Sequence, residues 1–400
     1  MQFKFDHSLM KRGRVIGLKK RIEKEILNFK EILNKGYNDE KSFVNLVSDK
    51  DLLNNVYKIA HKYKNFNSII VVGIGGSNLG TIAILEAIKG KYYNEFSKTK
   101  IYFADTTDPD NLNSIIKLAK GKVLLNIVTK SGTTTETIAN FEALFKKFKN
   151  IVITTDKGSK LWFFAKEKNF DLLEIPHNIG GRYSVFSNVS LFPLILTGIN
   201  VRKLLNGALV MRNKCLNSNN PAFVSASLVY LSNKKILDNW YFSNDLESLG
   251  KWYRQLMAES IGKNKKGITP IISIGSTDLH SMFQLNLDGP KDKFTCFLSL
   301  KKFNSDFIVS NFTENKLVEK INNKSLSKIM NAILNGVKIT YMKNKLPYVE
   351  IILDKKDEYN IGKYMMFKMI EIVYLASLFN VNAFDQPRVE EYKEETRKLL

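Results

Sequence analysis

The chain has 400 residues, 44% of them hydrophobic, and at roughly 150 residues per domain this length predicts two or three domains with sizeable cores. No apolar segment reaches the ~20 residues that a membrane-spanning helix needs, and the first 17 residues contain no apolar stretch long enough for a secretory signal. Because the two cysteines are also far apart, we expect a cytoplasmic protein without a membrane partner. The net charge of +22 could suit nucleic acid, but the lysines are spread from end to end without a basic tail. We therefore expect no nucleic-acid partner, and instead an attraction for small phosphorylated anions.

Residues 1–64 have a mostly helical pattern, in which apolar residues recur among lysines and glutamates, and we interpret them as a segment that wraps around the rest of the chain. Short β-branched runs then alternate with helical stretches. Because these runs are apolar on both faces, they predict a parallel sheet covered by helices on each side. The runs cover residues 68–75, 100–105, 122–129, 150–156 and 171–176.

An apolar helix near residues 187–199 precedes a second series of such runs, so the sequence predicts an α/β protein with two similar halves, residues 65–186 and 187–380. A long amphipathic helix at 361–379 ends the second half, and a Pro-initiated helix lies in the tail at 381–400. IIVVGIGGS at 69–77 and PIISIGSTD at 270–278 resemble each other, as duplicated halves would. The runs of the second series cover 239–243, 269–275, 293–300 and 348–354.

The first strand runs into a glycine-rich turn, GIGGSNLGT at 73–81. A dinucleotide fingerprint would need glycine at Asn78, and a P-loop would need lysine at Thr81, so neither motif is present. The turn still places Ser77 and free backbone N–H groups at a helix start, where an anion binds favourably. A tight turn that needs small residues and holds no ligand is the alternative.

The stretch TKSGTTTET at 129–137 follows another predicted strand in the same way. Its hydroxyls can donate to a phosphate monoester, Gly132 permits close backbone approach, and Lys130 can offset negative charge. An N-cap rich in hydroxyls, with Glu136 as the capping-box partner, would give the same pattern. Ligands of open α/β sheets bind where neighbouring strands end, which favours the phosphate interpretation. The hydroxyls belong to Thr129, Ser131, Thr133 and Thr134.

Three further side chains are candidates for chemistry. Arg182 follows a double glycine in NIGGRYSVFS and could stabilise charge that develops on oxygen. Glu259 ends the apolar face of a helix at 244–260, which we expect Asn244 and Glu247 to cap, and could move protons. His280, expected in the first turn of a helix, could give or take a proton. A solvated arginine, an inert helix-end glutamate and a packing histidine are the alternatives.

In their order along the chain, six segments resemble the phosphoglucose isomerase family, and the likeness runs from about residue 70 to 393. They are GIGGSNLG, TKSGTTTET, GGRYSVFS, LGKWYRQLMAES, TDLHSMFQ and FDQPRVEEYK. The length is similar to that of the shorter bacterial and archaeal branch. The resemblance implies two sugar-isomerase (SIS) domains, each a three-layer α/β/α unit, and a homodimer whose active site lies at the subunit interface. It implies interconversion of glucose 6-phosphate and fructose 6-phosphate.

The resemblance also implies a role for each matching residue. Glu259 would be the base that moves a proton between C1 and C2, Arg182 would stabilise the cis-enediolate, and His280 from the partner subunit would open the ring together with Lys393. In the tail, Arg388 replaces the glycine that the family usually has, which could shift the final helix or add a cation near the phosphate. The phosphate would be held by Gly76, Ser77, Thr129, Lys130, Ser131 and Thr134, with Gln255 and Gln386 nearby.

The residue types agree with this chemistry, because aldose–ketose isomerisation needs one base and stabilisation of an oxyanion, without a redox cofactor or a metal. No close grouping of histidine and cysteine indicates a zinc site. Two other functions stay open. A sugar-phosphate-sensing module would keep the loop at 129–134 without needing Glu259, whereas a nucleotide-dependent oxidoreductase would use the first glycine turn with Asp105.

Overall fold

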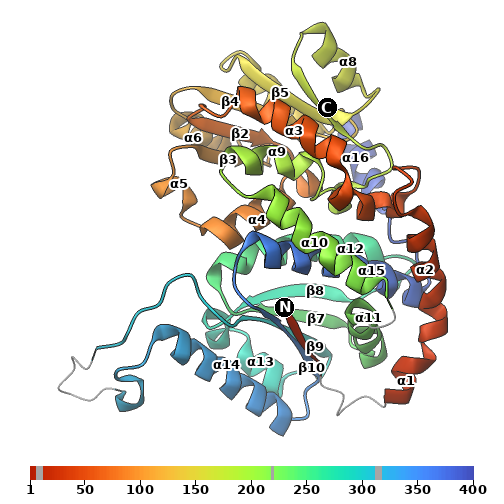
Figure 1. The fold of residues 1–400 in the computed structure, drawn as a ribbon, viewed down its shortest axis with the longest axis vertical. Helices are drawn as coiled ribbons and strands as arrows, with labels where there is room; N and C mark the ends of the chain where they lie inside the picture. The colour runs from red at the N-terminus through yellow and green to blue at the C-terminus, as the bar shows by residue number, and fades with distance from the viewer. Residues whose placement is uncertain (6–11, 218–219, 311–317) are drawn as a thin grey trace.

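The computed structural model describes residues 1–5, 12–217, 220–310 and 318–400. Two five-stranded sheets lie one above the other with helices between them (Figure 1). The first sheet is parallel throughout, in the order β3-β2-β4-β5-β6. Its strands coincide with the five predicted runs: β2 is Ser68–Val72, β3 is Lys100–Ala104, β4 is Val123–Val128, β5 is Asn150–Asp156 and β6 is Asp171–Ile175.

The second sheet has the order β1-β10-β9-β7-β8 and is parallel except for β1, which runs antiparallel to β10. The predicted runs are all present, with β7 beginning three residues earlier than expected. The helical interpretation of residues 1–64 was wrong at its start, where β1 forms an edge strand. The strands are β1 (Gln2–Phe5), β7 (Ile236–Tyr241), β8 (Thr269–Ile274), β9 (Lys293–Leu300) and β10 (Tyr348–Leu353).

Strand order reverses at one point in each sheet. The chain forms β2, adds β3 on one side of it and then adds β4 on the other; it repeats this with β7, β8 and β9. By position, β7 is therefore the counterpart of β2. The local likeness between residues 69–77 and 270–278 instead aligns β2 with β8, so that likeness is not the register in which the two sheets correspond.

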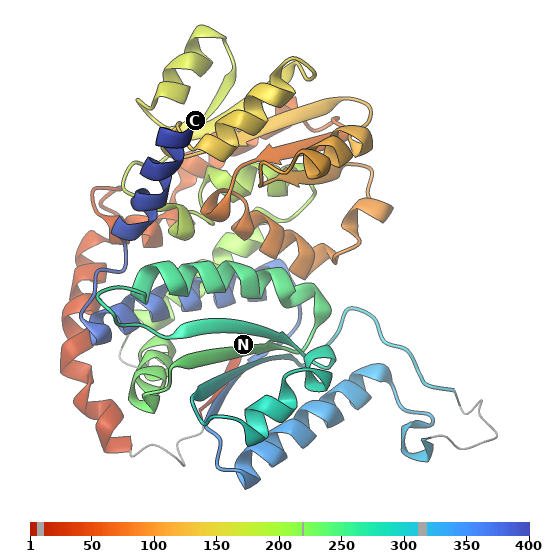
Figure 2. The same cartoon turned by 180° about the vertical axis from the view of Figure 1, so that it is seen from behind.

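The helices fill the connections between strands. Figure 2 shows α16 at the C-terminus beside the first sheet, whereas β1 at the N-terminus belongs to the second. No helix among the described residues is both long and apolar enough to cross a membrane. The α-helices are α1 (Arg12–Gly17), α2 (Lys19–Ile32), α3 (Lys50–Lys62), α4 (Leu79–Lys89), α5 (Tyr93–Phe96), α6 (Pro109–Leu118), α7 (Thr135–Phe145), α8 (Lys160–Glu167), α9 (Asn188–Leu196), α10 (Val201–Cys215), α11 (Pro221–Ser232), α12 (Glu247–Ile261), α13 (Phe283–Asp288), α14 (Leu326–Lys343), α15 (Glu358–Phe379) and α16 (Pro387–Leu399).

Among the described residues, apolar side chains form three clusters, one of which joins the two sheets. The outer face of the first sheet packs against α7 and α8, and the outer face of the second packs against α14. The inner faces of both sheets belong to a single large cluster that includes α4, α9, α10, α12 and α15. The two sheets therefore share one core, while the domain boundaries at 64/65, 186/187 and 380/381 stay a prediction.

Two glycines allow α10 and α15 to cross closely within this shared core. A Cβ at Gly207 would clash with the backbone of Tyr359, and one at Gly362 would clash with the backbone of Leu204. Both clashes are with carbonyl oxygens, which cannot rotate away as a side chain can. The crossing therefore requires that neither residue carries a side chain.

We expect Gly362→Ala to lower the free energy of unfolding by about 1–3 kcal/mol, because the added methyl group forces the two helices apart. Gly336→Ala is the matched control: Gly336 also lies within a helix, α14, but has no atom within 4 Å of an added Cβ. That variant should gain about 0.5–1 kcal/mol from helix propensity alone. Chemical denaturation of both variants tests this; equal effects would contradict the crossing argument.

Candidate active site

One cavity of about 530 Å³ opens where β2 and β4 end. These strands are neighbours, and they flank the point where strand order reverses, which is where open α/β sheets bind ligands. Every residue to which the family resemblance gives a role lines it except His280, and Thr133, whose hydroxyl was also a candidate, is absent from the lining. The lining comprises Ile74, Gly75, Gly76, Ser77, Thr129, Lys130, Ser131, Thr134, Glu136, Asp156, Gly181, Arg182, Gln255, Glu259, Gln386, Val389, Glu390, Tyr392 and Lys393.

The turn after β2 is held against the loop that carries Arg182. Gly75–Ser77 forms a short 3-10 turn, and a second such turn spans Gly181–Tyr183. A Cβ at Gly76 would clash with backbone atoms of Gly181 and Arg182. The small residues of GIGGSNLG thus have a structural role besides any role in ligand binding. They allow the two backbone turns to contact each other and form one wall of the cavity.

The loop after β4 turns its hydroxyls toward each other. Thr129 Oγ1 lies 2.9 Å from Thr134 Oγ1, and Ser131 Oγ lies 3.4 Å from the same atom. Thr134 occupies the N-cap position of α7, yet its side chain accepts no bond from the helix backbone. The capping alternative therefore does not explain these hydroxyls. Burial lowers the pKa of Lys130 below its ordinary value, with Asp156 and Glu40 partly opposing that effect.

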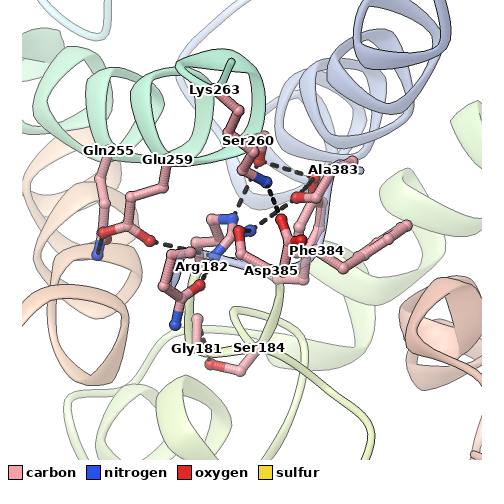
Figure 3. Close-up of polar contacts among 12 residues, drawn as sticks. Gly181, Arg182, Ser184, Gln255, Glu259, Ser260, Lys263, Ala383, Phe384 and Asp385 are labelled. Carbon is pink, nitrogen blue, oxygen red and sulfur yellow. Dashed lines mark hydrogen bonds and ion pairs between the residues drawn. The ribbon is translucent and has the colours of Figure 1, made fainter. Parts of the chain in front are cut away.

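Arg182 is the most fully bonded group of the cavity (Figure 3). Its side chain is 2% exposed, and all three guanidinium nitrogens donate. Nε donates to Ser260 Oγ at 3.0 Å, and Nη1 donates to Glu259 Oε2 at 3.2 Å and to Gln386 Oε1. Nη2 donates to the carbonyls of Ala383 at 2.7 Å and Asp385 at 3.0 Å. One cation thus joins α12 to the segment before α16.

Helix α12 brings two predicted residues to the cavity from the same face. Gln255 and Glu259 are one turn apart, and Gln255 Nε2 donates to Glu259 Oε1 at 2.9 Å. Both oxygens of the carboxylate are therefore bonded. The predicted cap of this helix was wrong: the N-cap is Leu246, without a side-chain bond, and Glu247 instead forms ion pairs with Lys91 and, at 2.8 Å, Lys251.

Helix α16 covers the cavity with its first turns. Lys393 lines the cavity, and its Nζ lies 2.7 Å from Glu390 Oε1. Arg388 is exposed and forms an ion pair with Glu391, so it adds no cation to the cavity lining. Lys393 thus lines the cavity although Arg388 occupies the position where the resemblance implies a glycine.

His280 lies apart from the other candidates. It is exposed, does not line the cavity, and ends the 3-10 turn Thr277–His280 instead of starting an α-helix. The expected first helical turn was therefore wrong, because α13 begins only at Phe283. This position leaves the ring available to something other than its own chain's cavity.

The sequence interpretation missed the acidic part of the lining. Asp156 and Glu136 both line the cavity, but neither was proposed as a site residue. Asp156 ends β5, the neighbour of β4 in the sheet. Ligands of open α/β sheets bind at the carboxyl ends of strands, and this holds for the end of β5 as it does for those of β2 and β4. Within the described residues, no group of three or more histidine, cysteine, aspartate or glutamate side chains could hold a metal ion.

Solved structures share this fold. A hypothetical protein from Thermus thermophilus superposes with a TM-score of 0.91 at 25% identity, over 99% of both chains. Glucose-6-phosphate isomerase from Chlamydia trachomatis gives 0.83 at 20% identity, over 99% of this chain and 87% of that one. Tagatose-6-phosphate ketose/aldose isomerase from Escherichia coli gives 0.53 at 11% identity, over 94% of each chain. The predicted SIS-type α/β architecture is confirmed.

Sequence relatives agree with the geometry. The chain is 35% identical to the probable glucose-6-phosphate isomerase of Methanococcus maripaludis, over 94% of this chain and 86% of that protein. It is also 35% identical to glucose-6-phosphate isomerase of Methanocaldococcus jannaschii, over 93% and 92%. A family model described as phosphoglucose isomerase matches residues 41–400. The chain therefore belongs to the phosphoglucose isomerase family.

Proposed function

We propose that the chain interconverts D-glucose 6-phosphate and D-fructose 6-phosphate, a step of glycolysis and gluconeogenesis, by ring opening and proton transfer through a cis-enediolate. The observation that carries this proposal is that a hydroxyl-rich loop and the carboxylate of Glu259 line one cavity. The names of the two relatives described above support the same reaction. A cytoplasmic location fits it, since Cys215 and Cys296 are both free thiols.

The 6-phosphate binds between the two strand-end loops. The hydroxyls of Ser77, Thr129, Ser131 and Thr134 donate to its oxygens, together with Lys130 and the backbone at Gly76. Gln255 and Gln386 lie nearby. Because the phosphate is remote from the reacting carbons, its binding energy can position C1 and C2 against the base while the phosphate itself takes no part in the reaction.

Glu259 carries the proton between C2 and C1. Gln255 and Arg182 hold one carboxylate oxygen each, at 2.9 and 3.2 Å, and this fixes the direction of the base. As the proton leaves C2, negative charge develops on the substrate oxygens. The guanidinium of Arg182 stabilises this enediolate, since it stays cationic at every relevant pH.

Ring opening uses Lys393 and a histidine from a second copy of the chain. Lys393 lines the cavity, whereas His280 is exposed outside the lining. In a homodimer with the active site at the subunit interface, His280 of one subunit would complete the cavity of the other. A single subunit would then be inactive.

A sugar-phosphate-sensing module is the main competing function, because it would need the same loop. It has no use for a carboxylate held by both oxygens, nor for Lys393. Turnover of fructose 6-phosphate by the purified chain in a coupled assay separates the two functions, and this turnover should be unchanged by a chelator.

A nucleotide-dependent oxidoreductase is the other alternative, and it would instead show a thermal shift with NAD or NADP. Asp105, the acid that this alternative would use, accepts a bond from Asn78 Nδ2 at 3.1 Å.

We expect Glu259→Gln to lower kcat by about 10²–10⁴-fold, because the amide cannot accept the C2 proton, while substrate still binds. Glu247→Gln is a control on the same helix, since Glu247 is absent from the cavity lining. Its kcat should stay near that of the wild type. Steady-state kinetics with a binding titration measure both; near-normal kcat in Glu259→Gln would remove the assigned role.

We expect Thr134→Ala to raise KM several-fold with less than about 0.5 kcal/mol loss of stability, because its hydroxyl caps nothing. Ser325→Ala is the matched control, for which we expect the opposite result in stability and in KM. Ser325 caps α14 through Lys328 N at 3.3 Å and lies outside the cavity lining, so this variant should lose about 1 kcal/mol and keep its KM. A Thr134 variant that is destabilised with unchanged KM would restore the capping interpretation.

The dimeric site predicts complementation between two inactive variants. We expect Glu259→Gln and His280→Gln to be nearly inactive alone, and mixed, reassembled dimers to regain about a quarter of wild-type activity, since half of the dimers then contain one intact site. The assay follows turnover after the two variants are mixed and refolded. Recovery would be absent if each subunit used its own histidine.

A further inference from the structure

An acidic side chain lies beside the loop to which we assign the phosphate. Asp156 lines the cavity, and its side chain is only 12% exposed. Its backbone N–H donates to the carbonyl of Lys130 at 3.2 Å, so it is attached to the loop itself. A carboxylate in this position repels a phosphate group, and the repulsion is strong where water is excluded. The assigned reaction gives this carboxylate no task.

His177 is the partner of this carboxylate. Strands β5 and β6 are parallel neighbours, and Asp156 is opposite Ile175, so the loop that leaves β6 brings His177 alongside. His177 Nδ1 lies 2.6 Å from Asp156 Oδ2. The imidazole is 80% exposed, whereas the carboxylate is buried. The exposed imidazole of His177 therefore lies on the solvent side of Asp156, whose carboxylate belongs to the cavity lining.

The basic side chains beside Asp156 come from two further segments. Lys130 belongs to the loop after β4 and His177 to the loop after β6, while Glu40, from the 3-10 segment Glu40–Ser48, acts on Lys130. Asp156 and Glu40 both raise the pKa of Lys130 against the effect of its burial. Asp156 thus favours the protonated form of Lys130 and also opposes the anion that Lys130 attracts.

We propose that Asp156 and His177 form a positioning pair that sets the affinity of the loop at 129–134 for phosphate. Asp156 lowers this affinity, and His177 offsets part of the negative charge of Asp156. This inference rests on the proposed function for the identity of the ligand. A moderate phosphate affinity is useful to an enzyme whose substrate and product carry the same phosphate group, because tighter binding of both does not raise kcat.

The test uses inorganic phosphate as the probe and measures how far it raises the thermal unfolding temperature of the full chain, which needs no turnover. We expect His177→Gln to weaken phosphate binding about three- to tenfold and Asp156→Asn to strengthen it by a similar factor. The double variant should match Asp156→Asn, because no charge is left for the histidine to offset. KM for fructose 6-phosphate should follow the same order, with kcat within about twofold of wild type.

His61→Gln is the control for the loss of a surface histidine. His61 contacts Lys64 and lies outside the cavity lining, so phosphate binding should not change. The proposal is overturned if His177→Gln has the same effect with and without Asp156, or if Asp156→Asn weakens phosphate binding. The proposed function fails separately, if the wild-type chain does not interconvert the two sugar phosphates. The phosphate titration would still decide the role of the pair.

Discussion

The burial of one guanidinium, that of Arg182, determines how the cavity is built. A cation removed from water is costly unless every donor finds an acceptor, and here all its nitrogens do. The acceptors belong to α12 and to the segment between α15 and α16, which lie far apart in sequence. Satisfying this single charge therefore fixes the distance between the carboxylate of Glu259 and the tail that carries Lys393.

The cavity combines parts that neither sheet could supply alone. The phosphate loops are strand ends of the first sheet, and their place follows from the reversal of strand order between β2 and β4. The proposed base instead comes from α12, which packs against β8 of the second sheet and against α4 of the first half. The loops assigned to the phosphate and the proposed base thus come from different halves of the chain, and the helices of the shared core set their relative position.

Much of this arrangement could be predicted from the sequence, because its signals are local. The strands are continuous β-branched runs, and the loops that follow them carry glycines and hydroxyls in short stretches. The failures are non-local. Strand β1 is only four residues long and gains its partner, β10, from the far end of the chain. The N-cap of α12 and the 3-10 turn that contains His280 were also predicted wrongly, because tertiary contacts outweigh local propensity there. Asp156 was overlooked because an aspartate at a strand end has many ordinary uses.

The layer of helices between the sheets has a consequence for how the molecule comes apart. Because α4, α10, α12 and α15 contribute to one apolar cluster that reaches both sheets, separating the halves would expose the apolar side chains of that cluster to water. The halves should therefore melt in a single cooperative transition, and fragments cut near residue 187 should not persist as independent folded units. Any ancestral half that once folded alone must have covered this inner face by other means.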